Sequence, residues 1–221
     1  SVQLIDWDLA LIQKYNYSGP RYTSYPTALE FSPEFGPAEF DAAVARYPQR
    51  PLSLYVHIPF CHKLCYFCGC NKIVTRQQHK ADQYLDVLEQ EIIHRAPLFA
   101  GRKVNQLHWG GGTPTYLNKA QISRLMGLLR THFNFNADAE ISIEVDPREI
   151  ELDVLDHLRL EGFNRLSMGV QDFNKEVQRL VNREQDEAFI FALLNHARDI
   201  GFTSTNIDLI CLLYTSPSPR D

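Results

Sequence analysis

The sequence contains no apolar run that approaches the roughly 20 residues needed to cross a lipid bilayer, so we expect no membrane-spanning segment. It also has no secretory signal pattern and no low-complexity tract. Only five of its 221 residues are cysteine. Without a signal peptide, these few cysteines predict free thiols in a reducing, cytoplasmic compartment and argue against a disulfide framework.

The chain also lacks an excess of positive charge. It has 22 Lys and Arg against 27 Asp and Glu, a net charge of −5, and the basic residues are scattered among the acidic ones. Proteins that grip a nucleic-acid backbone usually gather their basic residues into a patch or stripe. We therefore expect no nucleic acid among the partners.

Strand-like segments alternate with helical ones along the chain, which is the pattern of repeated βα units around a parallel sheet. The length falls short of the ~250 residues typical of a closed eight-unit barrel. We therefore predict an α/β fold, a partial (βα) barrel that stops after about the fifth strand. The predicted strands cover residues 52–59, 106–110, 140–146, 165–171 and 204–209, and the predicted helices cover residues 81–95, 118–133, 150–161 and 186–200.

Each predicted strand alternates polar and apolar side chains. Parallel strands covered on both faces are usually apolar throughout, so one face of this sheet is expected to be polar. A solvated face of an antiparallel sheet is one explanation, but the intervening helices favour a barrel whose lumen holds a polar ligand. The polar side includes Ser53, Tyr55, His57, Gln106, His108, Ser142, Glu144, Asp146, Ser167, Gln171, Ser204, Asn206 and Asp208.

Three cysteines, Cys61, Cys65 and Cys68, follow the first predicted strand within eight residues. Three thiolates can hold three irons of a four-iron cluster and leave the fourth iron open to a small molecule. Structural zinc is the alternative, with His57, His62 or Cys70 as a fourth ligand. Structural zinc sites usually pair two separated knuckles, and no convincing second knuckle is present, so the spacing favours iron–sulfur.

The second predicted strand runs into a glycine-rich stretch, residues 110–114 (Gly-Gly-Gly-Thr-Pro). Without side chains, backbone N–H groups can approach a ligand closely. A tight turn is the simpler explanation, and the spacing is not that of a dinucleotide or phosphate loop. In a βα barrel, however, this stretch would lie at the mouth beside the cysteine loop, where it could grip a ligand of the open iron.

Together, the Cys-x-x-x-Cys-x-Phe-Cys run, the Gly-Gly-Gly-Thr-Pro run and a Glu in the third strand resemble the radical S-adenosylmethionine (SAM) superfamily. Within it, residues 20–26 (Pro-Arg-Tyr-Thr-Ser-Tyr-Pro), 55–61, 67–71, 108–114 and 169–173 resemble the bacterial oxygen-independent coproporphyrinogen III oxidases over residues 1 to about 210. The resemblance implies a partial barrel followed by a C-terminal helical domain, of which this chain would be the N-terminal part.

The resemblance also implies a set of site residues. Cys61, Cys65 and Cys68 would ligate a [4Fe-4S] cluster whose fourth iron is chelated by SAM. Arg21, ahead of the barrel, would pair with substrate propionates. The first SAM would be lined by Tyr55, Gly111 and Glu144, and a second one by Phe67, Gly112, Thr113, Gln171, Arg183 and Asp208. From the residues alone, Arg183 is equally compatible with a solvated turn.

The implied reaction converts two propionate side chains of coproporphyrinogen III to vinyl groups, giving protoporphyrinogen IX in haem synthesis. A reduced cluster would cleave SAM to a 5′-deoxyadenosyl radical, which abstracts a propionate hydrogen before loss of carbon dioxide and an electron. An electron donor and an electron acceptor are needed, and the sequence identifies neither.

Two other functions remain open. Related haem chaperones share the radical SAM motifs but lack a cysteine equivalent to Cys70 and the run at residues 20–26, and both are present here. The oxidase is therefore favoured, although the role of Cys70 stays open. A zinc-stapled structural module would contain zinc and would not cleave the cofactor.

The expected organisation has three parts: a substrate-side segment (1–50), the incomplete radical SAM barrel (51–210) and a tail (211–221) that departs from the family pattern. We expect this tail to be non-native, because codons for residues 212–216 can reproduce the transposon end used in sequencing libraries. A disordered Ser/Pro-rich terminus is the alternative. Cys211, in the tail, is not expected to be a ligand, and the fragment is expected to be inactive alone.

Overall fold

The computed structural model describes residues 34–66, 68, 71–180 and 182–209. The chain divides into two compact units, residues 1–43 and 44–221. All the described strands and helices lie in the second unit, except the first part of α2. Arg21, Phe67, Cys70 and the tail at 211–221 lie outside the described residues. The helices are α2 (Pro37–Arg46), α3 (His79–Arg95), α4 (Lys119–His132), α5 (Leu152–Leu160), α6 (Lys175–Leu180) and α7 (Glu187–Asp199), with short 3₁₀ turns η2 (Ala96–Phe99) and η3 (Pro114–Tyr116).

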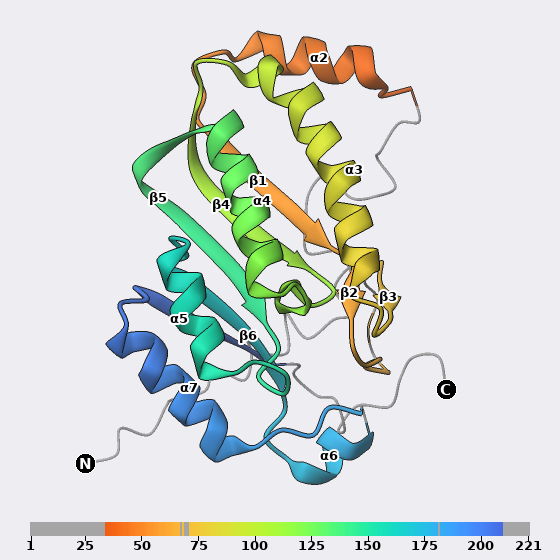
Figure 1. Ribbon diagram of the computed structural model, residues 1–221, viewed down its shortest axis with the longest axis vertical. Helices are drawn as coiled ribbons and strands as arrows, with labels where there is room; N and C mark the ends of the chain where they lie inside the picture. The colour runs from red at the N-terminus through yellow and green to blue at the C-terminus, as the bar shows by residue number, and fades with distance from the viewer. Residues whose placement is uncertain (1–33, 67, 69–70, 181, 210–221) are drawn as a thin grey trace, which may run out of the picture. The chain divides into compact units, whose positions relative to one another are not determined.

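Five parallel strands form the main sheet, and their spatial order follows the chain. The strands are β1 (Leu52–Ile58), β4 (Lys103–Gly111), β5 (Asn134–Val145), β6 (Arg165–Gln171) and β7 (Ser204–Leu209), each hydrogen-bonded to the next. Helices α3, α4, α5 and α7 lie along one side of the sheet (Figure 1). Successive βα units with their helices on one side build an open barrel, which confirms the predicted fold class.

The main core lies between the sheet and these helices. Every second residue of a strand points toward them, and Trp109 is fully buried there, edge-on to Phe163 at 5.0 Å between ring centroids. Helix α4 contributes the expected apolar stripe. Its N-terminus is closed by a capping box in which Asn118 and Gln121 each accept from the other's backbone N–H at 2.9 and 3.0 Å.

The opposite face of the sheet carries the polar residues, as the alternation predicted. It forms a pocket of about 400 Å³ lined by Ser53, Leu54, Tyr55, Gln106, Leu107, His108, Glu140, Ser142, Arg165, Ser167 and Asn206. Arg165 forms an ion pair with Glu140 at 2.9 Å there. The sheet is parallel, so a solvated antiparallel face does not explain the pattern.

The predicted bounds agree with the observed ones at β6 and β7. They differ at β4, which begins at Lys103 instead of residue 106, and at β5, which begins at Asn134 instead of residue 140. Residues 134–139 continue the polar–apolar alternation, but all except Phe135 are Asn, Ala or Asp, which are depleted in strands and therefore signal one weakly. The pairing is also irregular there: Lys103 and Val104 pair with Asn134 and Phe135, after which the register shifts so that Gln106 faces Glu140.

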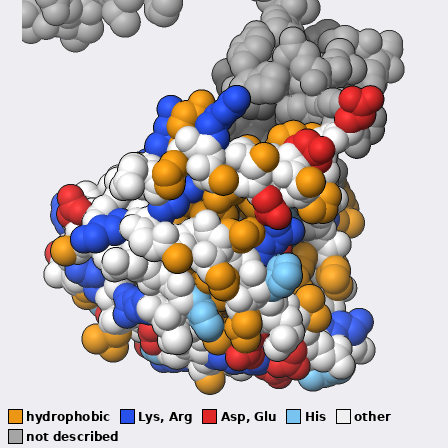
Figure 2. Space-filling view, turned by 90° about the horizontal axis from the view of Figure 1, so that it is seen from above, with side chains coloured by type: hydrophobic (Ala, Val, Ile, Leu, Met, Phe, Trp, Pro, Cys, Tyr) orange, Lys and Arg blue, Asp and Glu red, His pale blue; other side chains and the backbone are white. Residues whose placement is uncertain are grey.

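Among the described residues, no helix is long and apolar enough to cross a membrane. On the face of the molecule in Figure 2, Lys and Arg side chains are interspersed with Asp and Glu, so neither sign of charge dominates it.

Candidate functional site

The loop that carries the three cysteines is closed at its base by a small second sheet. Strands β2 (Phe60–Cys61) and β3 (Ile73–Val74) pair in parallel, and the Ile73 N–H donates to the carbonyl of Pro59 at 2.6 Å. The ends of the loop are thereby fixed directly after β1. A two-residue strand has too few positions to show a periodic pattern, so the sequence did not predict this pair.

The three thiols differ in exposure. Cys61 and Cys65 are both 8% exposed, whereas Cys68 is half-buried. Burial raises the pKa of the Cys61 thiol, and this outweighs the opposing effect of the Thr113 hydroxyl, which donates to its sulfur at 3.5 Å. A metal must displace the thiol proton, so binding to Cys61 is coupled to proton release.

The glycine-rich stretch is hydrogen-bonded to the segment that leads into the cysteine loop. The Gly112 N–H donates to the carbonyl of Ile58, and the Thr113 N–H to that of Phe60, both at 2.8 Å. Gly111 adopts a φ of +114°, which side chains rarely tolerate. A Cβ on Gly112 would lie 2.7 Å from the Phe60 carbonyl oxygen and 2.9 Å from the Cys61 sulfur. The stretch is therefore glycine because two backbones and a thiol meet there.

A pocket of about 190 Å³ opens between the glycine-rich stretch and the carboxyl ends of strands β4 to β7. It gathers seven of the nine residues predicted to hold SAM, while Tyr55 lines the larger pocket and Phe67 is outside the described residues. Its lining residues are Cys68, Gly111, Gly112, Thr113, Pro114, Glu144, Val145, Asp146, Gly169, Gln171, Arg183 and Asp208.

Glu144 is held by a network that joins the two pockets. One carboxylate oxygen lies 3.2 Å from His108 Nε2, and the other accepts the Gly111 N–H at 3.3 Å. The other ring nitrogen of His108 lies 2.6 Å from the Ser142 hydroxyl. The imidazole thus bridges two side chains of β5. It was not singled out from the sequence, although it alternates with Gln106 and Gly110 on the polar side of β4.

Tyr55 stands near this network at the C-terminal half of β1. Its ring stacks over His108 at 6.0 Å, and its hydroxyl lies 3.1 Å from His57 Nδ1. The other nitrogen of His57 lies 3.0 Å from the Asn71 carbonyl, at the far end of the cysteine loop. Tyr55 is therefore close to the glycine-rich stretch without lining the smaller pocket.

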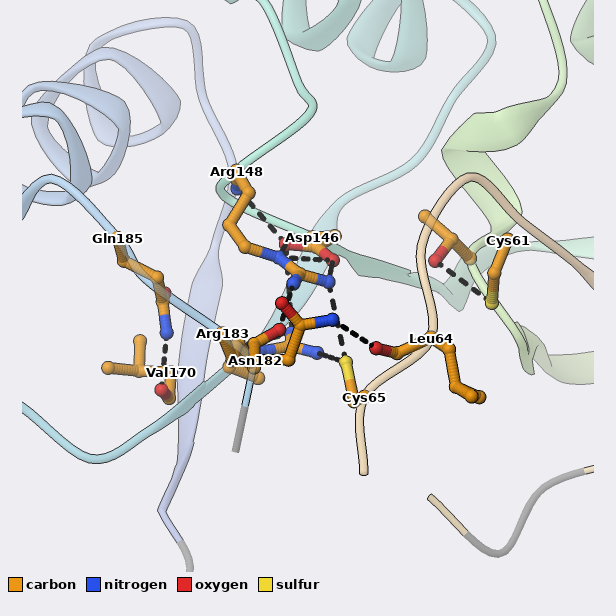
Figure 3. Close-up of polar contacts among 11 residues, drawn as sticks. Cys61, Leu64, Cys65, Asp146, Arg148, Val170, Asn182, Arg183 and Gln185 are labelled. Carbon is orange, nitrogen blue, oxygen red and sulfur yellow. Dashed lines mark hydrogen bonds and ion pairs between the residues drawn. The ribbon is translucent and has the colours of Figure 1, made fainter. Parts of the chain in front are cut away.

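Cys65 lies against a cluster of two arginines and an aspartate (Figure 3). Arg148 Nη2 and Arg183 Nη1 lie 3.4 and 3.2 Å from its sulfur. Asp146 pairs with Arg148 at 2.5 Å and with Arg183 at 3.7 Å. Burial alone would raise the pKa of Asp146, but the hydrogen bonds from Arg148 and the charges of both arginines lower it below its ordinary value.

Two residues near this cluster have an unusual backbone conformation. Gln171, at the end of β6, and Asn182, between α6 and α7, have φ values of +72° and +56°. Such values are uncommon for residues other than glycine and are found where the surroundings enforce them. Gln171 lines the pocket, and the Asn182 side chain donates to the Leu64 carbonyl in the cysteine loop at 2.8 Å.

The donor set fits a thiolate-bound cluster with an amino-acid ligand. Cys61 and Cys68 stand beside a glycine-rich stretch with almost no room for side chains, Glu144 and Asp208 can accept from ammonium or hydroxyl groups, and Arg183 can pair with a carboxylate. A drug-sized ligand usually fills 300 Å³ or more. A molecule as large as SAM would therefore extend beyond the smaller pocket, toward the lumen.

A site for a single metal ion needs side-chain ligands that lie close to one another. Tetrahedral zinc with bonds of about 2.3 Å brings its sulfur ligands to within about 4 Å of one another. In the part of the chain that the structure describes, no three His, Cys, Asp or Glu side chains are gathered for one metal ion. Cys70, one of the candidate fourth ligands of a zinc ion, lies outside the described residues.

Comparison with known proteins connects this geometry to a family. The family model "Radical SAM superfamily" matches residues 55–216. The oxygen-independent coproporphyrinogen III oxidase of Escherichia coli is 90% identical over 210 residues, which cover 95% of this chain and 46% of that protein. A protein of the same name from Mannheimia haemolytica is 68% identical over 143 residues, covering 65% of this chain and 98% of that sequence.

The solved structure of the Escherichia coli coproporphyrinogen III oxidase, described there as a radical SAM enzyme, superposes with a TM-score of 0.85 at 86% identity. The match covers 94% of this chain and 46% of that one. The chain thus spans about half the length of the first curated relatives it matches. It belongs to the radical SAM superfamily and, within it, to the family of the oxygen-independent coproporphyrinogen III oxidases.

Proposed function

We propose that this chain holds a [4Fe-4S] cluster through Cys61, Cys65 and Cys68 and binds SAM at the fourth iron. The observation that carries this proposal is the placement of the cysteine loop: Cys61 lies against the glycine-rich stretch, Cys68 lines the pocket at the carboxyl ends of the strands, and Cys65 lies against Arg183, which lines the same pocket. The four-iron cluster and SAM, when bound, supply a one-electron reductive cleavage that yields a carbon radical.

The chain's own residues bind and orient the cofactor. Glu144, fixed by His108 and the Gly111 N–H, presents a carboxylate to an ammonium or ribose group. Asp208 has the same chemistry at the end of β7, and its carboxylate accepts from the Ser167 hydroxyl at 3.0 Å. Thr113, Gln171 and Arg183 offer further polar groups, as expected for a second SAM beside the first. Tyr55 and Phe67 would add aromatic faces.

The reaction proposed for the whole protein is the oxygen-independent oxidative decarboxylation of coproporphyrinogen III. Relatives up to 90% identical are named for the oxidation of this substrate. Arg21 is proposed to pair with one of its propionates. Each propionate that becomes a vinyl group loses carbon dioxide and two electrons overall, so an external electron donor and acceptor complete the cycle. A content of only five cysteines in 221 residues fits a reducing compartment such as the cytoplasm.

The test is anaerobic reconstitution of the chain with iron and sulfide, followed by reduction with dithionite and incubation with SAM. We expect about four irons per chain and an electron paramagnetic resonance (EPR) signal that changes on SAM addition. A matched Cys68→Ala chain should lose both. Zinc in the purified chain, with no iron uptake, would contradict the proposal.

A further inference from the structure

The cluster around Cys65 points to a role that the proposed ligand set does not include. Two guanidinium groups from different segments converge on one sulfur, Arg148 after β5 and Arg183 after α6. Both are largely withdrawn from solvent, with side chains 8% and 12% exposed. Buried cations are usually paired, and here each faces both the thiol and Asp146.

Arg148 is fixed on every side. Its Nε donates to both carboxylate oxygens of Asp146 at 3.0 Å, its Nη2 to one of them at 2.5 Å, and its Nη1 to the Asn182 carbonyl at 3.0 Å. Figure 3 shows the guanidinium between the aspartate and the sulfur of Cys65. The remaining contact of Nη2, to Cys65, is therefore set by the fold and does not depend on a freely rotating side chain.

The same group of residues also positions the loop. The Asn182 carbonyl accepts a hydrogen bond from Arg148 Nη1. The Asn182 side-chain amide donates to the carbonyl of Leu64, the residue before Cys65. Arg183, the next residue, donates Nε and Nη2 to the Gly169 carbonyl at 3.1 and 2.7 Å, which leaves Nη1 for the sulfur. The segment at 182–183 and the cysteine loop are thus joined by three side chains.

Hydrogen bonds and charge near cluster sulfurs help to set the reduction potential of an iron–sulfur cluster. Reduction adds an electron, so a cationic N–H donor stabilises the reduced cluster more than the oxidised one and raises the potential. A nearby carboxylate stabilises the oxidised cluster more than the reduced one and therefore lowers the potential. The two arginines, the aspartate and a Cys65 thiolate sum to zero formal charge, so Asp146 limits the rise that the arginines produce.

We propose that Arg148 tunes the cluster through Cys65: it is a positioning residue that raises the reduction potential, while Asp146 holds it in place and partly opposes it. This inference rests on the proposed function, because it requires Cys65 to be a cluster ligand. Arg183 contributes a second donor to the same sulfur, in addition to its proposed role toward the cofactor.

The test compares midpoint potentials of the reconstituted full chain, measured by EPR-monitored redox titration without SAM. Arg148→Gln removes the cation, and we expect the preference for the reduced state to fall about tenfold, which for one electron is a shift of 59 mV to lower potential. Asp146→Asn should shift the potential the other way. Arg124→Gln is the control, because Arg124, on helix α4, also pairs with two carboxylates, Asp86 and Glu89 on helix α3.

A purely structural ion pair would give different results. Arg148→Gln leaves the Asp146 carboxylate without its main partner and can destabilise the fold. The double variant Asp146→Asn/Arg148→Gln avoids that unpaired charge, and we expect its potential to lie below that of the Asp146→Asn chain, because it lacks the arginine. Equal potentials in the Asp146→Asn and double variants would overturn the inference. Failure of the unsubstituted chain to assemble any cluster would instead contradict the proposed function, and the inference with it.

Discussion

At the scale of single residues, the site depends on groups that have almost no freedom. Gly112 has no room for a side chain, Arg148 is held by four contacts in addition to Cys65, and Glu144 is fixed by a backbone N–H and an imidazole. Preorganised groups of this kind bind a ligand without a further ordering cost.

Gly112→Ala tests the close approach of the glycine-rich stretch to the cysteine loop. The added methyl group would meet the Phe60 carbonyl and the Cys61 sulfur, neither of which is a flexible chain end. We expect a loss of stability of about 1–3 kcal/mol, as for overpacked sites, together with a large loss of iron uptake. Urea unfolding of the metal-free chain and iron analysis after reconstitution measure the two effects.

A matched control lies in helix α4. A Cβ on Gly127 would meet nothing within 4 Å. Gly127→Ala should raise stability by up to roughly 1 kcal/mol, because alanine is the better helix former, and should leave iron uptake unchanged. Equal iron uptake by the Gly112→Ala and Gly127→Ala chains would show that the close approach has no bearing on the cluster.

His108→Ala tests whether the imidazole positions Glu144. Loss of one hydrogen bond to the carboxylate should weaken SAM binding roughly three- to tenfold, which corresponds to about 0.7–1.4 kcal/mol. Anaerobic equilibrium dialysis with the reconstituted chain measures the dissociation constant. His108→Gln keeps a donor and should recover part of the affinity. If both variants bind SAM as the unsubstituted chain does, the bridge has no role in positioning.

Some of these residues could be predicted from the sequence and others could not. Cysteine and glycine carry their chemistry in short local motifs, so Cys61 to Cys68 and the glycine-rich stretch were found from spacing. The partners of Cys65 are 83 and 118 residues away along the chain. Only the fold brings them together, and Asp-Pro-Arg at 146–148 is no recognised motif.

At the scale of elements, the strand ends and their loops build the site. The alternation of polar and apolar side chains predicted β6 and β7 to the residue and gave the correct face to the others, since a half-buried strand repeats every two residues. The start of β5 was missed because it consists mostly of Asn, Ala and Asp, which are weak strand formers, and β2, β3 and α6 were missed because they are very short.

Because of Asp146, in the loop after β5, we expect the stability of the fold to depend on pH. The pKa of Asp146 lies below its ordinary value of 3.8 in the folded chain, because the arginines outweigh burial. A carboxyl with a lowered pKa stabilises the fold above its unfolded pKa, and this contribution is lost as the pH falls through the folded value. The free energy of unfolding of the metal-free chain should therefore decline below about pH 4.

Urea titrations of the reduced chain at several pH values measure this decline. The Asp146→Asn chain is expected to be less stable by about 3–5 kcal/mol at neutral pH, because it leaves buried arginines short of a partner. Its stability should also fall less steeply in acid. Parallel pH profiles for the two chains would show that the acid sensitivity arises elsewhere.

At the scale of the whole molecule, the order of the strands could be predicted because consecutive parallel strands joined by helices tend to lie side by side. This order puts the ends of β4, β5, β6 and β7 around one pocket and the polar face of the sheet around another. The pockets themselves could not be predicted, because their sizes depend on side-chain packing across strands. The first curated relatives it matches are about twice as long, so the substrate and its turnover are proposed for the whole protein.

The central claim is that SAM binds directly to an open iron of a cluster held by this chain. The most direct test is electron–nuclear double resonance on the reduced, reconstituted chain with SAM labelled by ¹⁵N at the amino group. We predict a nitrogen hyperfine coupling that changes when ¹⁴N replaces ¹⁵N, as expected for an amine bound to iron. A normal cluster signal with no coupling to the labelled nitrogen would contradict the claim.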